Sequence, residues 1–395
     1  MSTDEPLARR RFRPADLAIV LLIIGVCLWL GISFVARSRS EARAKSCREN
    51  LQKLAMAVVE YDTRFNRLPG YMNAMKDSDD KAYIDPRTGK SSPVSWAVEL
   101  LPDLEQKQLY ERWRQPSGAA GENRNSDYLR TPVAVFRCPD DGRDASGPLL
   151  SYVANTGRQD IPTSIAASAQ AAESLRGAAA SKGMPRDWLA NGLFFDTYSD
   201  DASVKLDPAT RGPMVISRLQ SIIDAKDKTL LFTENVDAGS YVFDPHEVPD
   251  GDPALAEIGW GCIWGSGKID ETAMLAAWKI EESKRSSTVD DDHGPRGPQI
   301  FPTLIPDPPA SAINAHLDEP RRGRSYKYCR PASHHVGGVN IAMAGRNVVF
   351  AKETVSYFLY AKLLASRDDS MQKPGSTEFE SEWLRKFQIA ERLCE

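Results

Sequence analysis

The sequence lacks the short motifs that mark the common classes of enzyme and metal-binding protein. It has no Walker A loop, no G-x-G-x-x-G fingerprint and no H-E-x-x-H pair. Its six cysteines form no C-x-x-C pair, and it has only five histidines. An excess of positive charge is also missing, since 50 Lys and Arg face 54 Asp and Glu. We therefore expect that the protein is not an enzyme and has no nucleic-acid partner.

A long apolar run is present near the N-terminus. Leu17 to Val35 is 19 residues without a charge, which as a helix measures about 28 Å, close to the thickness of a bilayer core. A cleaved signal peptide would have a shorter apolar core and a small-x-small site, whereas Arg37 and Arg39 follow here. We therefore interpret 15–36 as a retained transmembrane helix. Residues 1–14 are then a cytoplasmic segment, and membrane lipid is a partner.

The helix is expected to continue beyond this run, over 37–70. No Pro or Gly occurs from Ser38 to Phe65. Apolar residues recur there at helical spacing, at Leu51, Leu54, Ala55, Val58 and Phe65. Leu68-Pro69-Gly70 ends the pattern. The sequence thus predicts one helix with an apolar first half and an amphipathic second half.

The rest of the chain predicts a large head at 71–370 and an amphipathic tail helix at 371–395. We expect a helix from Ser95 to Arg114, capped by Ser95 and broken at Pro102. Residues 285–325 are a long loop. Short strands are predicted at 131–137, 149–154, 192–195, 214–217 and 229–233, and a hairpin of 339–343 and 347–351 around Ala344-Gly345.

Five of the six cysteines follow the apolar run. Cys47 with Cys138 and Cys262 with Cys329 are candidate disulfides. Unpaired, buried thiols are the alternative reading.

Several sequence blocks, in this order and spacing, resemble the bacterial family called domain of unknown function 1559, from about Arg11 to Asp368. They are C-R-E-N-L-Q-K-L from Cys47, S-W at Ser95-Trp96 with L-L-P-D-L-E-Q from Leu100, and F-R-C-P-D-D, which includes Cys138 and Pro139. Phe12 and Asp16 fit the register of a prepilin N-terminus, but Arg11 stands where the processing site needs Gly. His334 and Gly345 fit the family's H-x(9)-D-G motif, with Ala344 in place of its Asp.

The resemblance implies an α+β fold, in which a long pilin-like helix with a membrane-spanning first half packs on an antiparallel β-sheet head with long loops and extra helices. It also implies a pilin- or pseudopilin-like structural or assembly protein of the cell envelope. Such a protein would sit in the inner (cytoplasmic) membrane by a single pass, with its head in the periplasm or cell exterior. Its partners would be other pilin-like subunits or secretion-system components.

Two other functions are weighed against this one. A membrane-tethered protein could bind a small molecule or polysaccharide in a pocket lined by Trp260, Trp264 and Trp278. A hydrolase could use His334 with a carboxylate, but we expect His334 to brace the hairpin by a hydrogen bond. No cofactor is expected. Calcium is the one ion considered, at the acidic clusters Asp140-Asp141, Asp196 with Asp200-Asp201, and Asp290–Asp292.

Overall fold

A computed structural model describes part of the chain. The described residues are 14–76, 81–82, 84, 93–114, 130–143, 147–157, 192–195, 197–198, 217–222, 225–242, 313–314, 317, 331–355, 360, 363–364 and 366. The predicted tail helix at 371–395 and most of the predicted loop at 285–325 lie outside these residues.

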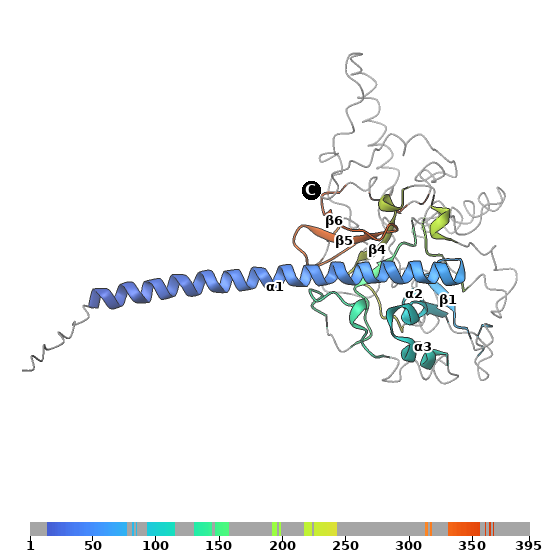
Figure 1. Ribbon diagram of the computed structural model, residues 1–395, viewed down its shortest axis with the longest axis horizontal. Helices are drawn as coiled ribbons and strands as arrows, with labels where there is room; N and C mark the ends of the chain where they lie inside the picture. Colours follow the sequence, from blue (N-terminus) through green and yellow to red (C-terminus); the bar gives the residue numbers. More distant parts are fainter. Residues whose placement is uncertain are drawn as a thin grey trace, which may run out of the picture.

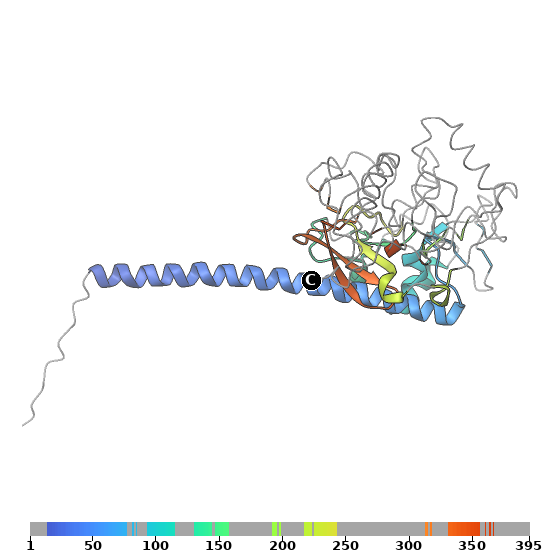
Figure 2. The same cartoon turned by 90° about the horizontal axis from the view of Figure 1, so that it is seen from above.

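The longest element is the helix α1, Pro14–Phe65, of 52 residues. Its C-terminal part lies along the head, and its N-terminal part projects away from it (Figures 1 and 2). Leu51, Leu54 and Val58 are fully buried in the head, as their spacing predicts. Phe65, expected on the same face, is 44 % exposed and contacts Arg64, whose guanidinium carbon lies 4.6 Å from its ring centre. The last turn of α1 therefore passes the edge of the core.

The prediction of a membrane-spanning segment is contradicted. Among the described residues, no helix combines the length and the apolarity needed to cross a membrane. This finding overturns the transmembrane helix assigned to 15–36, the single-pass inner-membrane localisation, and the fold class built on a pilin-like helix of that kind. The α+β mixture with antiparallel sheets remains.

Two antiparallel sheets form the head. Strands β1, Met72–Ala74, and β2, Pro93–Ser95, make a small ribbon. The main sheet has the order β3-β4-β5-β6. Its strands are β3, Tyr152–Ala154, β4, Leu230–Glu234, β5, Gly338–Met343, and β6, Val348–Lys352. All residues of β3, β4 and β5 are buried, and α1 packs against β4, β5 and β6.

The predicted hairpin is present as β5 and β6, but its turn differs from the one expected. The reversal uses three residues, and the left-handed residue is Arg346 with φ 71°, not Ala344. Gly345 is needed for close approach instead. A Cβ there would lie 3.2 Å from the backbone nitrogen of Asp227, and the Gly345 amide donates to the carbonyl of Lys226 at 2.8 Å. The hairpin turn is thus packed against the segment that leads into β4.

The helical region after Ser95 is divided into three short pieces. They are α2, Trp96–Glu99, the 3-10 turn η1, Leu101–Leu104, and α3, Lys107–Trp113. The break expected at Pro102 falls within η1. Ser95 does not cap the helix, because its hydroxyl donates instead to the carbonyl of Tyr241 at 3.2 Å.

Two predicted strands are absent from the described residues. Within the strand expected at 131–137 the chain forms the 3-10 turn η3, Ala134–Phe136. Val133 and Phe136 are buried there at a spacing of three, which suits a helical turn rather than a strand. Residues 192–195 are buried but form no strand. The strands predicted at 149–154 and 229–233 are present as β3 and β4. Residues 214–216 of the strand predicted at 214–217 lie outside the described residues.

Aromatic side chains fill the space between α1, the main sheet and the α2 segment. Trp96 lies at their centre and is fully buried. Its ring centre is 4.8 Å from that of Phe232 and 5.9 Å from that of Phe136. Phe232 also contacts Phe194, and Phe136 contacts Tyr241. Trp96, which the family resemblance singled out, is therefore a core residue.

Asn155, directly after β3, joins three separate segments of the chain. Its side-chain amide donates to the carbonyls of Leu230 at 2.7 Å and Leu364 at 2.9 Å. Its own carbonyl accepts from the amides of Leu193 and Phe194. Beside it, Gly157 and Gly192 are in contact, since a Cβ on Gly192 would lie 2.7 Å from the Gly157 Cα.

Candidate functional site

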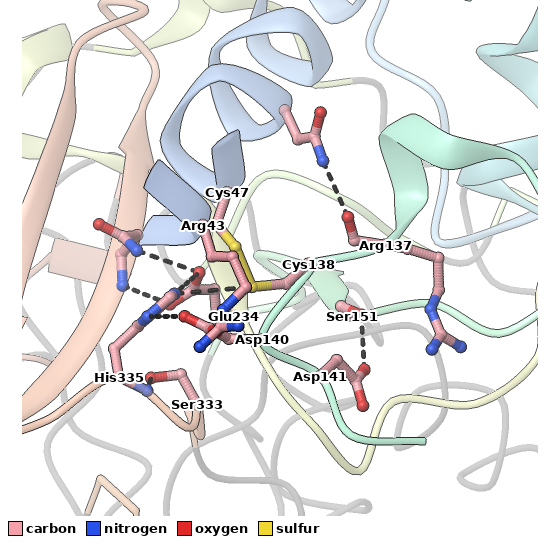
Figure 3. Close-up of a disulfide and its surroundings, with 12 residues drawn as sticks. Arg43, Cys47, Arg137, Cys138, Asp140, Asp141, Ser151, Glu234, Ser333 and His335 are labelled. Atoms are coloured by element: carbon pink, nitrogen blue, oxygen red, sulfur yellow. Dashed lines mark hydrogen bonds and ion pairs between the residues drawn. A yellow bond between two sulfur atoms is a disulfide. The ribbon is translucent and has the colours of Figure 1, made fainter. Parts of the chain in front are cut away.

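A disulfide joins α1 to the head. Cys47 on α1 and Cys138 after η3 are bonded, and both are buried. This is one of the two candidate pairs from the sequence; Cys262 and Cys329 lie outside the described residues. One helical turn further on, Asn50 donates from its amide to the carbonyl of Arg137 at 2.8 Å (Figure 3). The helix is therefore tied to the loop after η3 by a covalent bond and a neighbouring hydrogen bond.

The block C-P-D-D forms a tight turn that places two carboxylates. The Asp141 amide donates to the Cys138 carbonyl at 2.9 Å, which closes a four-residue turn with Pro139 in its second position. Proline suits that position because its φ is already set near the required value. Asp140 then faces the disulfide side of the turn, and Asp141 faces Ser151 (Figure 3).

Two acidic side chains, the buried Glu234 and the partly buried Asp140, flank His335 beside the disulfide. Its Nδ1 lies 3.1 Å from an oxygen of Asp140, and its Nε2 lies 3.1 Å from Oε1 of Glu234. The same Nε2 is 3.5 Å from the sulfur of Cys138. Arg43 of α1 pairs with the other oxygen of Asp140. Four separate segments therefore meet at this imidazole (Figure 3).

The orientation of Glu234 and of His335 is fixed by neighbours. Asn340 of β5 donates from its backbone amide to Glu234 Oε2 at 2.7 Å and from its side chain to Oε1 at 3.0 Å. The His335 amide donates to the hydroxyl of Ser333 at 3.1 Å, and that hydroxyl donates to the Gly338 carbonyl at 2.7 Å. Hydrogen bonds from β5 to Glu234, and from the His335 backbone to Ser333, therefore hold both residues in place.

The protonation of His335 follows from these contacts. Burial by itself lowers the pKa of an imidazole, but the hydrogen bond and charge of Glu234, with the charge of Asp140, raise the pKa of His335 above its usual value. The cationic imidazole is therefore favoured between the two carboxylates.

Asp141 forms a second, adjacent ion pair. Burial would raise its pKa, but the hydrogen bonds and charge of Arg143 outweigh burial and hold the pKa of Asp141 below its usual value. The Ser151 hydroxyl also donates to Asp141 at 2.6 Å, and Arg143 donates to the carbonyl of Ala238 at 2.6 Å. This pair braces the start of β3 against the segment after β4.

The residues singled out from the sequence meet only in part. Cys47, Cys138 and Pro139 lie at the cluster, whereas Trp96 lies in the core and Gly345 at the hairpin turn. His334 is exposed, and its neighbour His335 occupies the cluster instead. Phe12 lies outside the described residues, and Asp16 lies in α1 with its side chain undescribed.

His335, Glu234 and Arg43 were missed by sequence reasoning. The pair His334-His335 offered a partial signal, because neighbouring side chains of an extended segment point to opposite faces, so a motif at His334 left the other face to His335. The position of Glu234 at the end of an apolar strand was a second signal. Nothing in the sequence placed Arg43 against Asp140.

The donor atoms at the cluster lie close enough together to hold a metal ion. One ligand atom each from Cys47, Cys138, Glu234 and His335 lies within 4.8 Å of the others. Asp140 and Asp141, considered for calcium, are paired with cationic side chains. The other acidic clusters and the tryptophans considered for a binding pocket lie outside the described residues.

Comparison with known proteins gives one match. The sequence model of a family described as a protein of unknown function, DUF1559, matches residues 37–356. No curated protein and no solved structure matches the chain. The matched region includes the disulfide, the C-P-D-D turn, Glu234 and His335, and covers well over half of the chain, so this protein belongs to the DUF1559 family.

Proposed function

We propose that this protein is a non-catalytic structural subunit of the pilin-like kind, which assembles with further copies of itself through the N-terminal half of α1. The observation that carries the proposal is the contrast between the two halves of this helix. The C-terminal half packs one face on its own head, while the N-terminal half carries a run of apolar side chains that are largely exposed.

The exposed apolar residues lie on every side of the helix. They are between 46 and 75 % exposed, and they are Leu21, Leu22, Ile23, Ile24, Val26, Leu28, Trp29, Leu30, Ile32, Phe34 and Val35. Successive residues of an α-helix turn by about 100°, so such a run covers the whole circumference. A helix that is apolar all round favours burial among other apolar surfaces.

Other copies of the same helix supply a matching surface. Burying a Leu, Ile or Phe side chain stabilises an assembly by about 1.5–3 kcal/mol, so a few such contacts per copy are enough for association. Gly25 and Gly31 have nothing within 4 Å of a hypothetical Cβ, which lets a second backbone approach closely. The disulfide from Cys47 to Cys138 would hold the projecting helix to its head under load.

The test is the oligomeric state of the purified full-length chain by sedimentation velocity. We expect one defined oligomer, which the double variant Leu22→Glu/Trp29→Glu converts to a monomer. Met56→Glu is the matched control, because Met56 is 47 % exposed on the docked half of the same helix, and it should leave the oligomer intact. A monomeric wild-type chain, a broad mixture of sizes, or a double variant that still forms the oligomer would contradict the proposal.

Cys27 provides a second readout. It lies exposed in the apolar run as a free cysteine, so mild oxidation should link neighbouring copies through it. Cys27→Ser should remove the linked dimer, and a cysteine introduced at Met56 in that background should not restore it.

A further inference from the structure

Beyond this structural role, the disulfide cluster has the composition of a metal site that is closed by oxidation. We propose that reduction of the Cys47–Cys138 disulfide turns the cluster into a tetrahedral site for a thiolate-binding divalent cation such as Zn²⁺. Its four ligands are the sulfurs of Cys47 and Cys138, Nε2 of His335 and Oε1 of Glu234. The four atoms already lie within 4.8 Å of one another, and all four residues are buried.

The distances fit a zinc ion. With bonds of about 2.3 Å to sulfur and about 2.0 Å to nitrogen and oxygen, a tetrahedral ion holds sulfur and nitrogen about 3.5 Å apart and nitrogen and oxygen about 3.3 Å apart. Here Cys138 Sγ lies 3.5 Å from His335 Nε2, and Nε2 lies 3.1 Å from Glu234 Oε1. Only the two sulfurs must move, to about 3.8 Å apart, once their bond is broken.

The residues around these ligands are arranged as they are around protein-bound zinc. A ligating histidine usually donates its second ring N–H to a carboxylate, which fixes its tautomer and orientation. Asp140 takes that place at 3.1 Å from His335 Nδ1, and it is itself held by Arg43. Asn340 orients the Glu234 carboxylate through two hydrogen bonds. His335 and Glu234 are thus both aimed before any ion binds.

The chemistry balances with a dithiol as reductant. The dithiol is oxidised to a cyclic disulfide, the Cys47–Cys138 bond breaks, and its two electrons and the two dithiol protons produce two cysteine thiols. The ion then displaces one proton from each thiol, together with the proton that His335 Nε2 shares with Glu234. Metal binding should therefore release protons and strengthen as the pH rises.

The consequence is a link between α1 and the head that survives reduction. Cys47 belongs to α1, whereas the other three ligands belong to the head. In oxidising surroundings the covalent bond joins the two parts. In reducing surroundings that contain zinc, the ion would join them through the same residues.

The experiment uses the full-length chain with Cys27, Cys262, Cys329 and Cys394 replaced by Ser, so that only the cluster thiols remain. The protein is equilibrated with Zn²⁺ with or without a phosphine reductant. The phosphine takes the place of the dithiol: it is oxidised to a phosphine oxide with an oxygen from water, whose two protons go to the two thiols. The protein is then freed of unbound ion and analysed for metal. We expect one zinc per chain after reduction and none in the oxidised protein. Equal zinc in both states, or none after reduction, would overturn the proposal.

Variants locate the ion. His335→Gln should weaken zinc binding, measured by competition with a chromophoric chelator, by well over tenfold. Asp140→Asn, which removes the second-shell carboxylate, should weaken it by about 10–100-fold. His334→Gln is the matched control, because it removes the exposed neighbouring histidine and should change nothing. If the His334→Gln and His335→Gln variants bind zinc with the same affinity, the ion lies elsewhere and the proposal is refuted.

A spectroscopic measurement does not depend on how these variants fold. Co²⁺ added to the reduced four-serine chain should give the intense visible bands of tetrahedral cobalt together with sulfur-to-cobalt charge transfer. A weak, octahedral spectrum without charge transfer would refute the proposed ligands. Because this readout concerns the cluster and not the exposed N-terminal half of α1, it can fail while the proposed assembly through that half holds, and the reverse is equally true.

Discussion

Removal of the Cys47–Cys138 disulfide should produce a large and specific loss of stability. The bond closes a loop with a sequence separation of 91 residues. In the chain-entropy model, a cross-link that closes such a loop lowers the entropy of the denatured state. This raises the free energy of the denatured state by about 4.6 kcal/mol at 25 °C relative to a chain without the cross-link. The double variant Cys47→Ala/Cys138→Ala should therefore lower the free energy of unfolding by about 4–5 kcal/mol.

The assay is guanidinium denaturation followed by tryptophan fluorescence. Trp96 and Trp113 are both fully buried in the head, so their emission reports its unfolding. The midpoint should fall, and the denaturant slope should rise, because an unfolded chain without the cross-link exposes more surface. Cys27→Ser removes an exposed, unpaired thiol and should leave both quantities unchanged. A loss below about 1 kcal/mol in the double variant would refute the reasoning.

Two further substitutions test the packing and the electrostatics of the head. Gly338→Ala should destabilise the protein by about 3 kcal/mol in the same assay, because its Cβ would lie 2.1 Å from the Ala351 carbonyl oxygen; Gly142→Ala, which meets nothing within 4 Å, should be neutral. Burial raises the pKa of Glu99, so the folded state binds its proton more tightly than the unfolded state does. The stabilisation of the folded state by protonated Glu99 is fully present below the pKa of glutamate in the unfolded chain, about 4.3. It is lost as the pH rises through the higher pKa that Glu99 has in the folded state. Glu99→Gln should remove that loss, so stability measured from pH 4 to 8 should fall less than in wild type, whereas exposed Glu60→Gln should follow wild type.

The spacing of apolar residues in the sequence predicted those elements of the fold that depend on contacts between near neighbours in the chain. The spacing of Leu51, Leu54 and Val58 identified the buried face of α1, because a helix that docks on a sheet must present such a face. The hairpin of β5 and β6 followed from two alternating runs around a glycine. Its turn was mispredicted, since the role of Gly345 is set by contact with Asp227, which is remote in sequence.

The candidate site was only half visible in the sequence. Cys47 and Cys138 stood out as a pair, but their ion-pairing neighbours come from segments that meet only in the folded chain. The family motif pointed to His334, whereas packing turned His335 inward, where Glu234 and Asp140 hold it. The apolar run in α1 was recognised as a helix, but its interpretation as a membrane span was wrong.

The contact between Gly157 and Gly192 brings together two backbones that are 35 positions apart in the sequence. Both glycines are buried, and Asn155 holds the two sides of the contact, since its side-chain oxygen accepts from the Gly157 amide and its backbone carbonyl accepts from the amides of Leu193 and Phe194. A Cβ at Gly192 would lie 2.7 Å from the Cα of Gly157. The two backbones can therefore lie this close only while position 192 has no side chain.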